Sequence, residues 1–145
     1  MMKRRGFLTA VALAVLAGCS DGPGVTSGAL VAEVESRWAL QSVDGRGLPT
    51  RQQVTFEAAA DVTAARLTVT ADGAWVYRYD QVTAEGGQDS ITSGGATGTY
   101  EPMSADPPTI RMLDGETQET FVGAYKQGAL EVTMRGQVLR FARVP

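Results

Sequence analysis

The chain has 145 residues, with 43% hydrophobic and 20% charged residues, a formal net charge of −3, one cysteine and no histidine. This length fits one domain built around a single hydrophobic core. The acidic balance argues against nucleic acid as a partner. A chain without histidine cannot carry Ser-His-Asp or Cys-His catalysis, and it lacks the usual ligands of zinc and copper sites. We therefore expect no enzyme activity, no cofactor and no metal.

The first eighteen residues have the architecture of an export signal. Lys3, Arg4 and Arg5 form a positively charged start, and residues 7–17 are apolar at ten of eleven positions. As a helix this run would rise roughly 16 Å, about half of the ~30 Å hydrocarbon core of a bilayer. It is too short to span a membrane, so we interpret residues 1–18 as a signal peptide that is removed.

The end of this segment, Leu16, Ala17, Gly18 and Cys19, resembles the lipobox of bacterial lipoproteins. The family's pattern is Leu, a small residue, Gly or Ala, and then Cys. The resemblance implies that Cys19 is lipidated and becomes the first residue of the mature protein, with enough acyl chains for stable anchoring. Ser20 resembles the residue that sorts such proteins to the outer membrane. We therefore expect a lipid-anchored protein of the cell envelope, on the periplasmic face of the outer membrane in a Gram-negative host.

Two export routes stay open. Arg4 and Arg5, followed by Gly6, Phe7 and Leu8, are similar to the twin-arginine signal, which exports folded domains. An ordinary Sec signal that carries adjacent arginines fits equally well.

The mature chain begins with a tether. Residues 19–28 are rich in Gly and Ser and too poor in apolar side chains to pack, whereas residues 29–36 favour one or two helical turns. Removing residues 1–18 leaves ten basic residues against 16 acidic ones, a net charge of −6. Membrane attachment therefore depends on the lipid and not on a basic patch.

Residues 37–145 predict an all-β domain, because apolar residues recur with period two and turn residues return every eight to fourteen positions. An antiparallel up-and-down meander of about 8–9 strands would leave two exposed edges unless it closed as a small barrel. A two-sheet β-sandwich is the alternative. We expect a proline-bearing connection over 102–108 and strands near 38–42, 51–57, 67–69, 75–80, 90–100, 109–113, 117–125, 129–134 and 138–143.

One predicted strand is unusual in composition. Residues 90–100 contain Gly94, Gly95 and Gly98 and few apolar side chains. Glycine inside a strand marks a bulge, a sharp bend or a close approach of the backbone. We expect this segment to form a corner of the barrel.

The segment from Trp38 to Pro49, which reads Trp-Ala-Leu-Gln-Ser-Val-Asp-Gly-Arg-Gly-Leu-Pro, resembles the opening of small bacterial lipocalin-like lipoproteins. Residues 67–75, 98–100 and 130–141 extend the resemblance over most of the domain. It implies a lipocalin-like barrel. In lipocalins an arginine near the end of the last strand packs over the indole of the first strand. Arg140 and Arg143 are both candidates here, and we assign the structural pair to Trp38 and Arg140.

Five aromatic residues are candidates for ligand binding, because a small barrel either fills its interior with side chains or holds one small ligand. One function is therefore a monomeric, non-enzymatic barrel that binds an apolar or amphipathic molecule. The other is a filled structural module that contacts another envelope protein. The five residues are Trp75, Tyr77, Tyr79, Phe121 and Tyr125.

Overall fold

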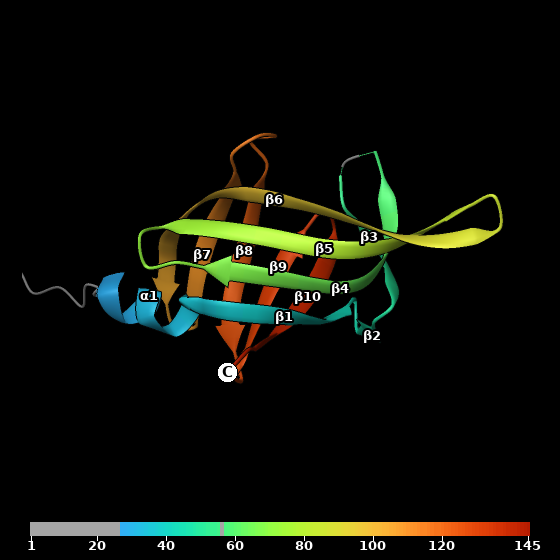
Figure 1. The fold of residues 1–145 in the computed structure, drawn as a ribbon. Helices are drawn as coiled ribbons and strands as arrows, with labels where there is room; N and C mark the ends of the chain where they lie inside the picture. Colours follow the sequence, from blue (N-terminus) through green and yellow to red (C-terminus); the bar gives the residue numbers. More distant parts are fainter. Residues whose placement is uncertain (1–26, 56) are drawn as a thin grey trace, which may run out of the picture.

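The computed structural model describes residues 27–55 and 57–145, which form an antiparallel β-barrel (Figure 1). The predicted fold class is confirmed. Within these residues eight strands close the barrel and two short strands extend it. The elements are α1 (Ser27–Val34), β1 (Ser36–Val43), β2 (Arg46–Gly47), β3 (Thr50–Gln53), β4 (Ala59–Val69), β5 (Ala74–Glu85), β6 (Gln88–Ala105), β7 (Pro108–Asp114), β8 (Thr120–Lys126), β9 (Ala129–Met134) and β10 (Gln137–Arg143).

Strand β1 closes the barrel. Its Trp38 lies opposite Arg143 of β10 on one side and opposite Leu67 of β4 on the other. The remaining barrel strands, β4 to β10, pair with their neighbours in chain order. Because β1 joins the two ends of this meander, the sandwich alternative is excluded. The short strands β2 and β3 pair with β1 and β4.

The core lies inside the barrel and is closed at one end by α1. Inward-facing residues alternate with exposed ones along the strands, as in β7, where Ile110 and Met112 are fully buried. Helix α1 lies beside β1 at one end of the barrel, and the hairpin of β5 and β6 projects past the opposite end (Figure 1). The indole Nε1–H of Trp38 donates to the carbonyl oxygen of Val34 at 3.0 Å, which fastens α1 to the core.

Small residues of β6 make room for aromatic rings of β5. In the β-ladder Trp75 lies opposite Gly98 and Tyr79 opposite Gly94, with Tyr77 opposite Ala96 between them. A Cβ at position 98 would lie 2.8 Å from the indole of Trp75, and one at position 94 would overlap the phenol of Tyr79. The pairing of β5 with β6 runs without a register shift. No bulge lies at these glycines, and the close approach of the rings explains them, while the expected barrel corner stays a prediction.

The expected proline-bearing connection over 102–108 is also wrong. Strand β6 continues to Ala105 and β7 begins at Pro108, so that only two residues connect them. A register shift between Pro102 and Ser104 accommodates the first proline, because a bulge does not require the N–H that proline lacks.

Other strand boundaries differ where local irregularities interrupt the pattern. Strand β4 begins at Ala59, well before the expected 67–69, because a register shift between Val62 and Ala64 disturbs the period-two alternation. Strand β8 begins at Thr120 and not at 117, since the preceding residues form a turn closed by the Asp114 N–H, which donates to the carbonyl of Glu119. Strand β3 covers only part of the expected 51–57.

Candidate functional site

The five aromatic residues predicted to line a ligand site belong to the core or pack against it. Trp75, Tyr77 and Phe121 expose only 1%, 5% and 3% of their surface. The ring centroids of Trp75 and Phe121 lie 6.3 Å apart, and those of Tyr77 and Tyr79 lie 5.8 Å apart. The fifth residue, Tyr125, packs against the core as well. The structure thus packs four of these side chains as two ring pairs, whereas the ring of Tyr125 contacts Trp38 instead.

Arg143, and not Arg140, packs over Trp38. Its guanidinium carbon lies 4.9 Å from the centroid of the Trp38 ring and 5.8 Å from that of Tyr125, and it donates to a backbone carbonyl of α1. Arg140 forms an ion pair with Glu131 at 2.7 Å. The assignment of Arg140 is therefore wrong, because the register places Arg143 directly opposite Trp38.

A buried polar pair lies beside these rings. The hydroxyl of Tyr77 donates to Oε1 of Gln52 at 2.7 Å, and Gln52 is completely buried. Burial raises the pKa of Tyr77 above its ordinary value. Among the described residues, Nε2 of Gln52 has no hydrogen-bond partner. Gln52 could not be singled out from the sequence, because a glutamine in a short polar strand carries no sign of burial.

An almost buried ion pair joins the β7–β8 and β9–β10 turns. The Arg135 guanidinium donates to both carboxylate oxygens of Glu119 at 2.9 Å and to the carbonyl of Val54 at 2.8 Å. It also lies over the Phe121 ring, 5.3 Å from the centroid. The sequence carries no local sign of this role for Arg135. Its partner is 16 positions away, and local patterns do not connect such positions.

The turn carboxylates bind backbone groups. One carboxylate oxygen of Asp114 accepts the N–H groups of Glu116 and Thr117 at 2.8 and 2.9 Å, and Asp44 accepts the N–H of Val138 at 2.8 Å. Such Asp side chains shape turns. In the part of the chain that the structure describes, no group of three or more Asp, Glu or Cys residues is placed to hold a metal ion.

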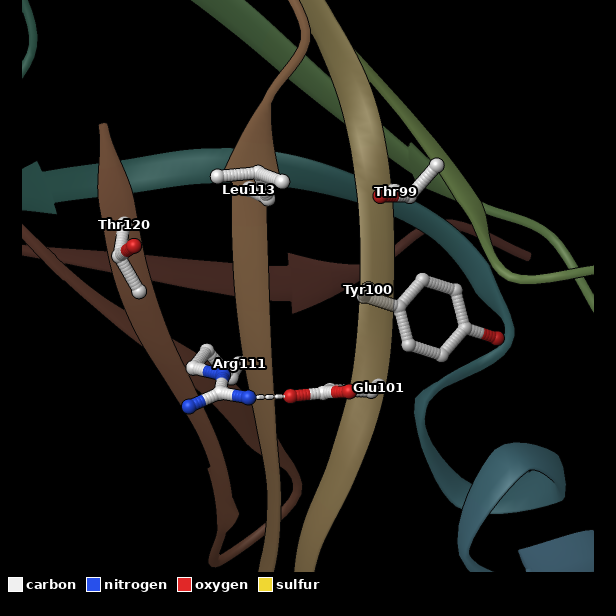
Figure 2. A pocket seen from close by; sticks show the side chains of 6 residues that line it. All are labelled: Thr99, Tyr100, Glu101, Arg111, Leu113 and Thr120. Atoms are coloured by element: carbon white, nitrogen blue, oxygen red, sulfur yellow. Dashed lines mark ion pairs between the residues drawn. The ribbon is translucent and has the colours of Figure 1, made fainter. Parts of the chain in front are cut away.

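A shallow hollow of about 370 Å³ lies on the outer wall of the barrel (Figure 2). The register places Leu113 between Thr99 and Thr120, and Arg111 between Glu101 and Val122. Six residues of β6, β7 and β8 share this face and form what we call the outer patch: Thr99, Glu101, Arg111, Leu113, Thr120 and Val122. Figure 2 shows the Glu101–Arg111 ion pair, with the Tyr100 ring turned away toward the other side of the sheet.

The outer patch combines exposed aliphatic and polar groups. Leu113 and Val122 are diagonal neighbours across β7 and β8 and expose 37% and 39% of their surface. The ion pair beside them offers one charge of each sign. An aliphatic centre with a polar rim is the usual composition of a protein interface.

Comparisons were made with protein-family models, curated proteins and solved structures. None of them matches this chain. Within the described residues no helix is long and apolar enough to cross a membrane. The signal residues Arg4 and Arg5 and the motif Leu16 to Cys19, Cys19 included, lie outside the described residues. The expected signal peptide, lipidation and export route therefore remain predictions.

Proposed function

We propose that this protein is a lipid-anchored, non-enzymatic member of the cell envelope whose filled, lipocalin-like barrel contacts another envelope protein through the outer patch. The anchor rests on the resemblance of Leu16 to Cys19 to a lipobox. The lipocalin-like assignment is supported by the meander topology and by the stacking of Arg143 on Trp38.

The observation that carries the proposal is the packing of the barrel interior. Trp75, Tyr77 and Phe121 are almost inaccessible, and each ring contacts another ring. The indole N–H of Trp75 and the hydroxyl of Tyr77 already donate hydrogen bonds within the protein. The outer patch, in contrast, leaves Leu113 and Val122 partly exposed beside an ion pair. Recognition by the outer wall requires no rearrangement of the core, whereas a ligand inside would have to displace packed side chains.

A second candidate function is the binding of a small amphipathic molecule inside the barrel. One observation favours it. The amide nitrogen of Gln52 is buried without a hydrogen-bond partner among the described residues, and a buried donor of this kind would gain from a ligand acceptor.

Site-specific photo-crosslinking in the host envelope tests the proposed function. A photoreactive amino acid is placed at Val122 in the outer patch, and the control carries it at Gln41, an exposed position of β1. We expect one discrete adduct with another envelope protein from position 122 and a much weaker one from position 41. Equal adduct patterns, or none from either position, would refute the outer patch as the interface.

The anchor has its own test. We expect Cys19→Ala to leave the precursor unprocessed or to release the protein from membranes, because the acylated thiol is lost. Unchanged partitioning into the detergent phase would show that Cys19 is not the anchor.

A further inference from the structure

The N-terminal part of β6, residues 88–97, has a free edge. Strand β6 pairs with β5 from Gln88 onward, but its pairing with β7 begins only at Gly98. Residues 88–97 therefore have one partner strand in the described part of the chain. This segment forms the hairpin with β5 that projects beyond the barrel (Figure 1).

Two hydrogen bonds show which residues direct their backbone groups to the free edge. The carbonyl of Thr97 accepts the N–H of Gly115, on the β7 side, and the N–H of Tyr100 donates to Gly73, on the β5 side. Along a strand, backbone groups of alternate residues point to the same side. The N–H and C=O groups of residues 89, 91, 93 and 95 therefore point to the free edge.

This edge lacks the usual protection against strand pairing. Residues 89–97 contain no Lys, Arg or Pro, and β-strand edges are commonly protected by such residues. Ile91 exposes 73% of its surface, more than any other large hydrophobic residue that the structure describes. Its cross-strand neighbour Val82 is partly exposed. An exposed aliphatic residue on an unpaired edge favours the addition of another strand.

We propose that a second copy of this chain pairs with the free edge of β6, antiparallel and with Thr92 on the two-fold axis. This register places Asp89 opposite Gly95 of the partner subunit and Ile91 opposite Ser93 of the partner subunit. Each such pair exchanges two N–H···O bonds, and the symmetry repeats both pairs. The pairing stops before Thr97, whose carbonyl already accepts the N–H of Gly115.

The side chains fit a second copy in this register. Ile91 lies diagonal to the partner's Ile91, within reach on the outer face, so two exposed aliphatic groups become covered. Asp89 lies opposite the partner's Gly95. On the same face, Arg78 of β5 is paired with Gly95. Because Gly95 has no side chain, Arg78 and the partner's Asp89 meet across it as opposite charges, twice in the dimer.

Disulfide trapping in the envelope tests this inference. Thr92 would face its own copy as a non-hydrogen-bonded pair with Cα atoms about 4.5 Å apart, a separation that suits a disulfide. We expect Thr92→Cys to form a disulfide-linked dimer on a non-reducing gel after free thiols are blocked. The matched control is Ser90→Cys, on the same face and also exposed. Its two Cα atoms would lie about 14 Å apart, so at least roughly tenfold less dimer is expected.

A second substitution separates specific pairing from random collision. Ile91→Lys in the Thr92→Cys chain adds a charge at the axis without disturbing the monomer, because Ile91 is exposed there. We expect it to abolish the disulfide dimer, while the wild-type chain forms none. No dimer from Thr92→Cys, equal dimer from Ser90→Cys, or a dimer that survives Ile91→Lys would each overturn the inference.

The self-association is independent of the proposed function. The free edge of β6 and the outer patch share no residue, so the Ile91→Lys chain should retain the adduct formed from position 122. Absence of the adduct from position 122 in a chain that keeps Ile91 and still forms the Thr92→Cys disulfide dimer would instead count against the proposed function alone.

Discussion

Substitution of Gly98 tests whether the aromatic rings of β5 pack closely against the small residues of β6. In Gly98→Ala the new Cβ would overlap the carbonyl oxygen of Leu113 and lie 2.8 Å from two ring carbons of Trp75. Carbon atoms pack at about 3.5–4.0 Å, so the ring would have to move by roughly 1 Å. Overpacking costs about 1–3 kcal/mol and occasionally more. Because one obstacle is backbone and cannot rotate away, we expect Gly98→Ala to lower the free energy of unfolding by about 3 kcal/mol or more.

Two other glycines provide graded controls. In Gly94→Ala the Cβ would meet only the end of the Tyr79 side chain, which is partly exposed and can swing outward. The expected loss is under about 1 kcal/mol. In Gly47→Ala the Cβ meets nothing within 4 Å and the φ angle is not positive, so stability should stay equal or rise by up to about 1 kcal/mol.

The assay is urea unfolding followed by tryptophan fluorescence, since Trp38 and Trp75 are both buried. The expected order of unfolding free energies is Gly47→Ala highest, then Gly94→Ala, then Gly98→Ala. A loss below about 1 kcal/mol for Gly98→Ala would refute the close packing of Trp75 on β6, because no such overlap could then exist.

Three further predictions concern polar contacts of the core. Glu119→Gln leaves a nearly buried guanidinium without its charge partner and should cost about 3–5 kcal/mol in urea unfolding; a loss within about 0.5 kcal/mol would contradict the buried pair. Arg143→Ala removes the stacking on Trp38 and should lower the free energy of unfolding by about 1–2 kcal/mol. Arg140→Ala, whose ion pair is partly exposed, should lower it by under about 1 kcal/mol. The reverse order would contradict the assignment of Arg143 as the partner of Trp38. Burial raises the pKa of Tyr77, so the unfolded chain loses this proton near pH 10 while the folded chain keeps it. The free energy of unfolding therefore falls as pH rises further, by about 1.4 kcal/mol per pH unit from this group. Tyr77→Phe should show a fall shallower by nearly that slope between about pH 11 and 12, and an unchanged slope would exclude the buried phenol as its source.

The fold class was predictable because local chemistry determines it. The hairpin turns at Gln127-Gly128 and Arg135-Gly136 have positive φ angles at both residues, the conformation that tight hairpins require. Together with the period-two pattern, these turns determine an antiparallel meander, and a meander of this length closes on itself to remove its edges.

The corrections arise where contacts depend on register. Whether Arg140 or Arg143 reaches Trp38 depends on which of them lies opposite it, and sequence spacing does not specify this. The glycines of β6 are explained by rings on β5, and the partner of Arg135 lies on another turn. Each requires the pairing of strands to be known, so these features could not be predicted from local patterns.

Native mass spectrometry tests whether the barrel interior is filled by its own side chains, as the proposed function requires. The protein would be extracted from the host envelope in mild detergent and measured without removal of bound lipid. We expect the mass of the mature chain with its proposed acyl groups, or of multiples of it, with no additional small molecule. A stoichiometric extra mass that is lost when the protein unfolds would contradict it and identify the interior as a binding site.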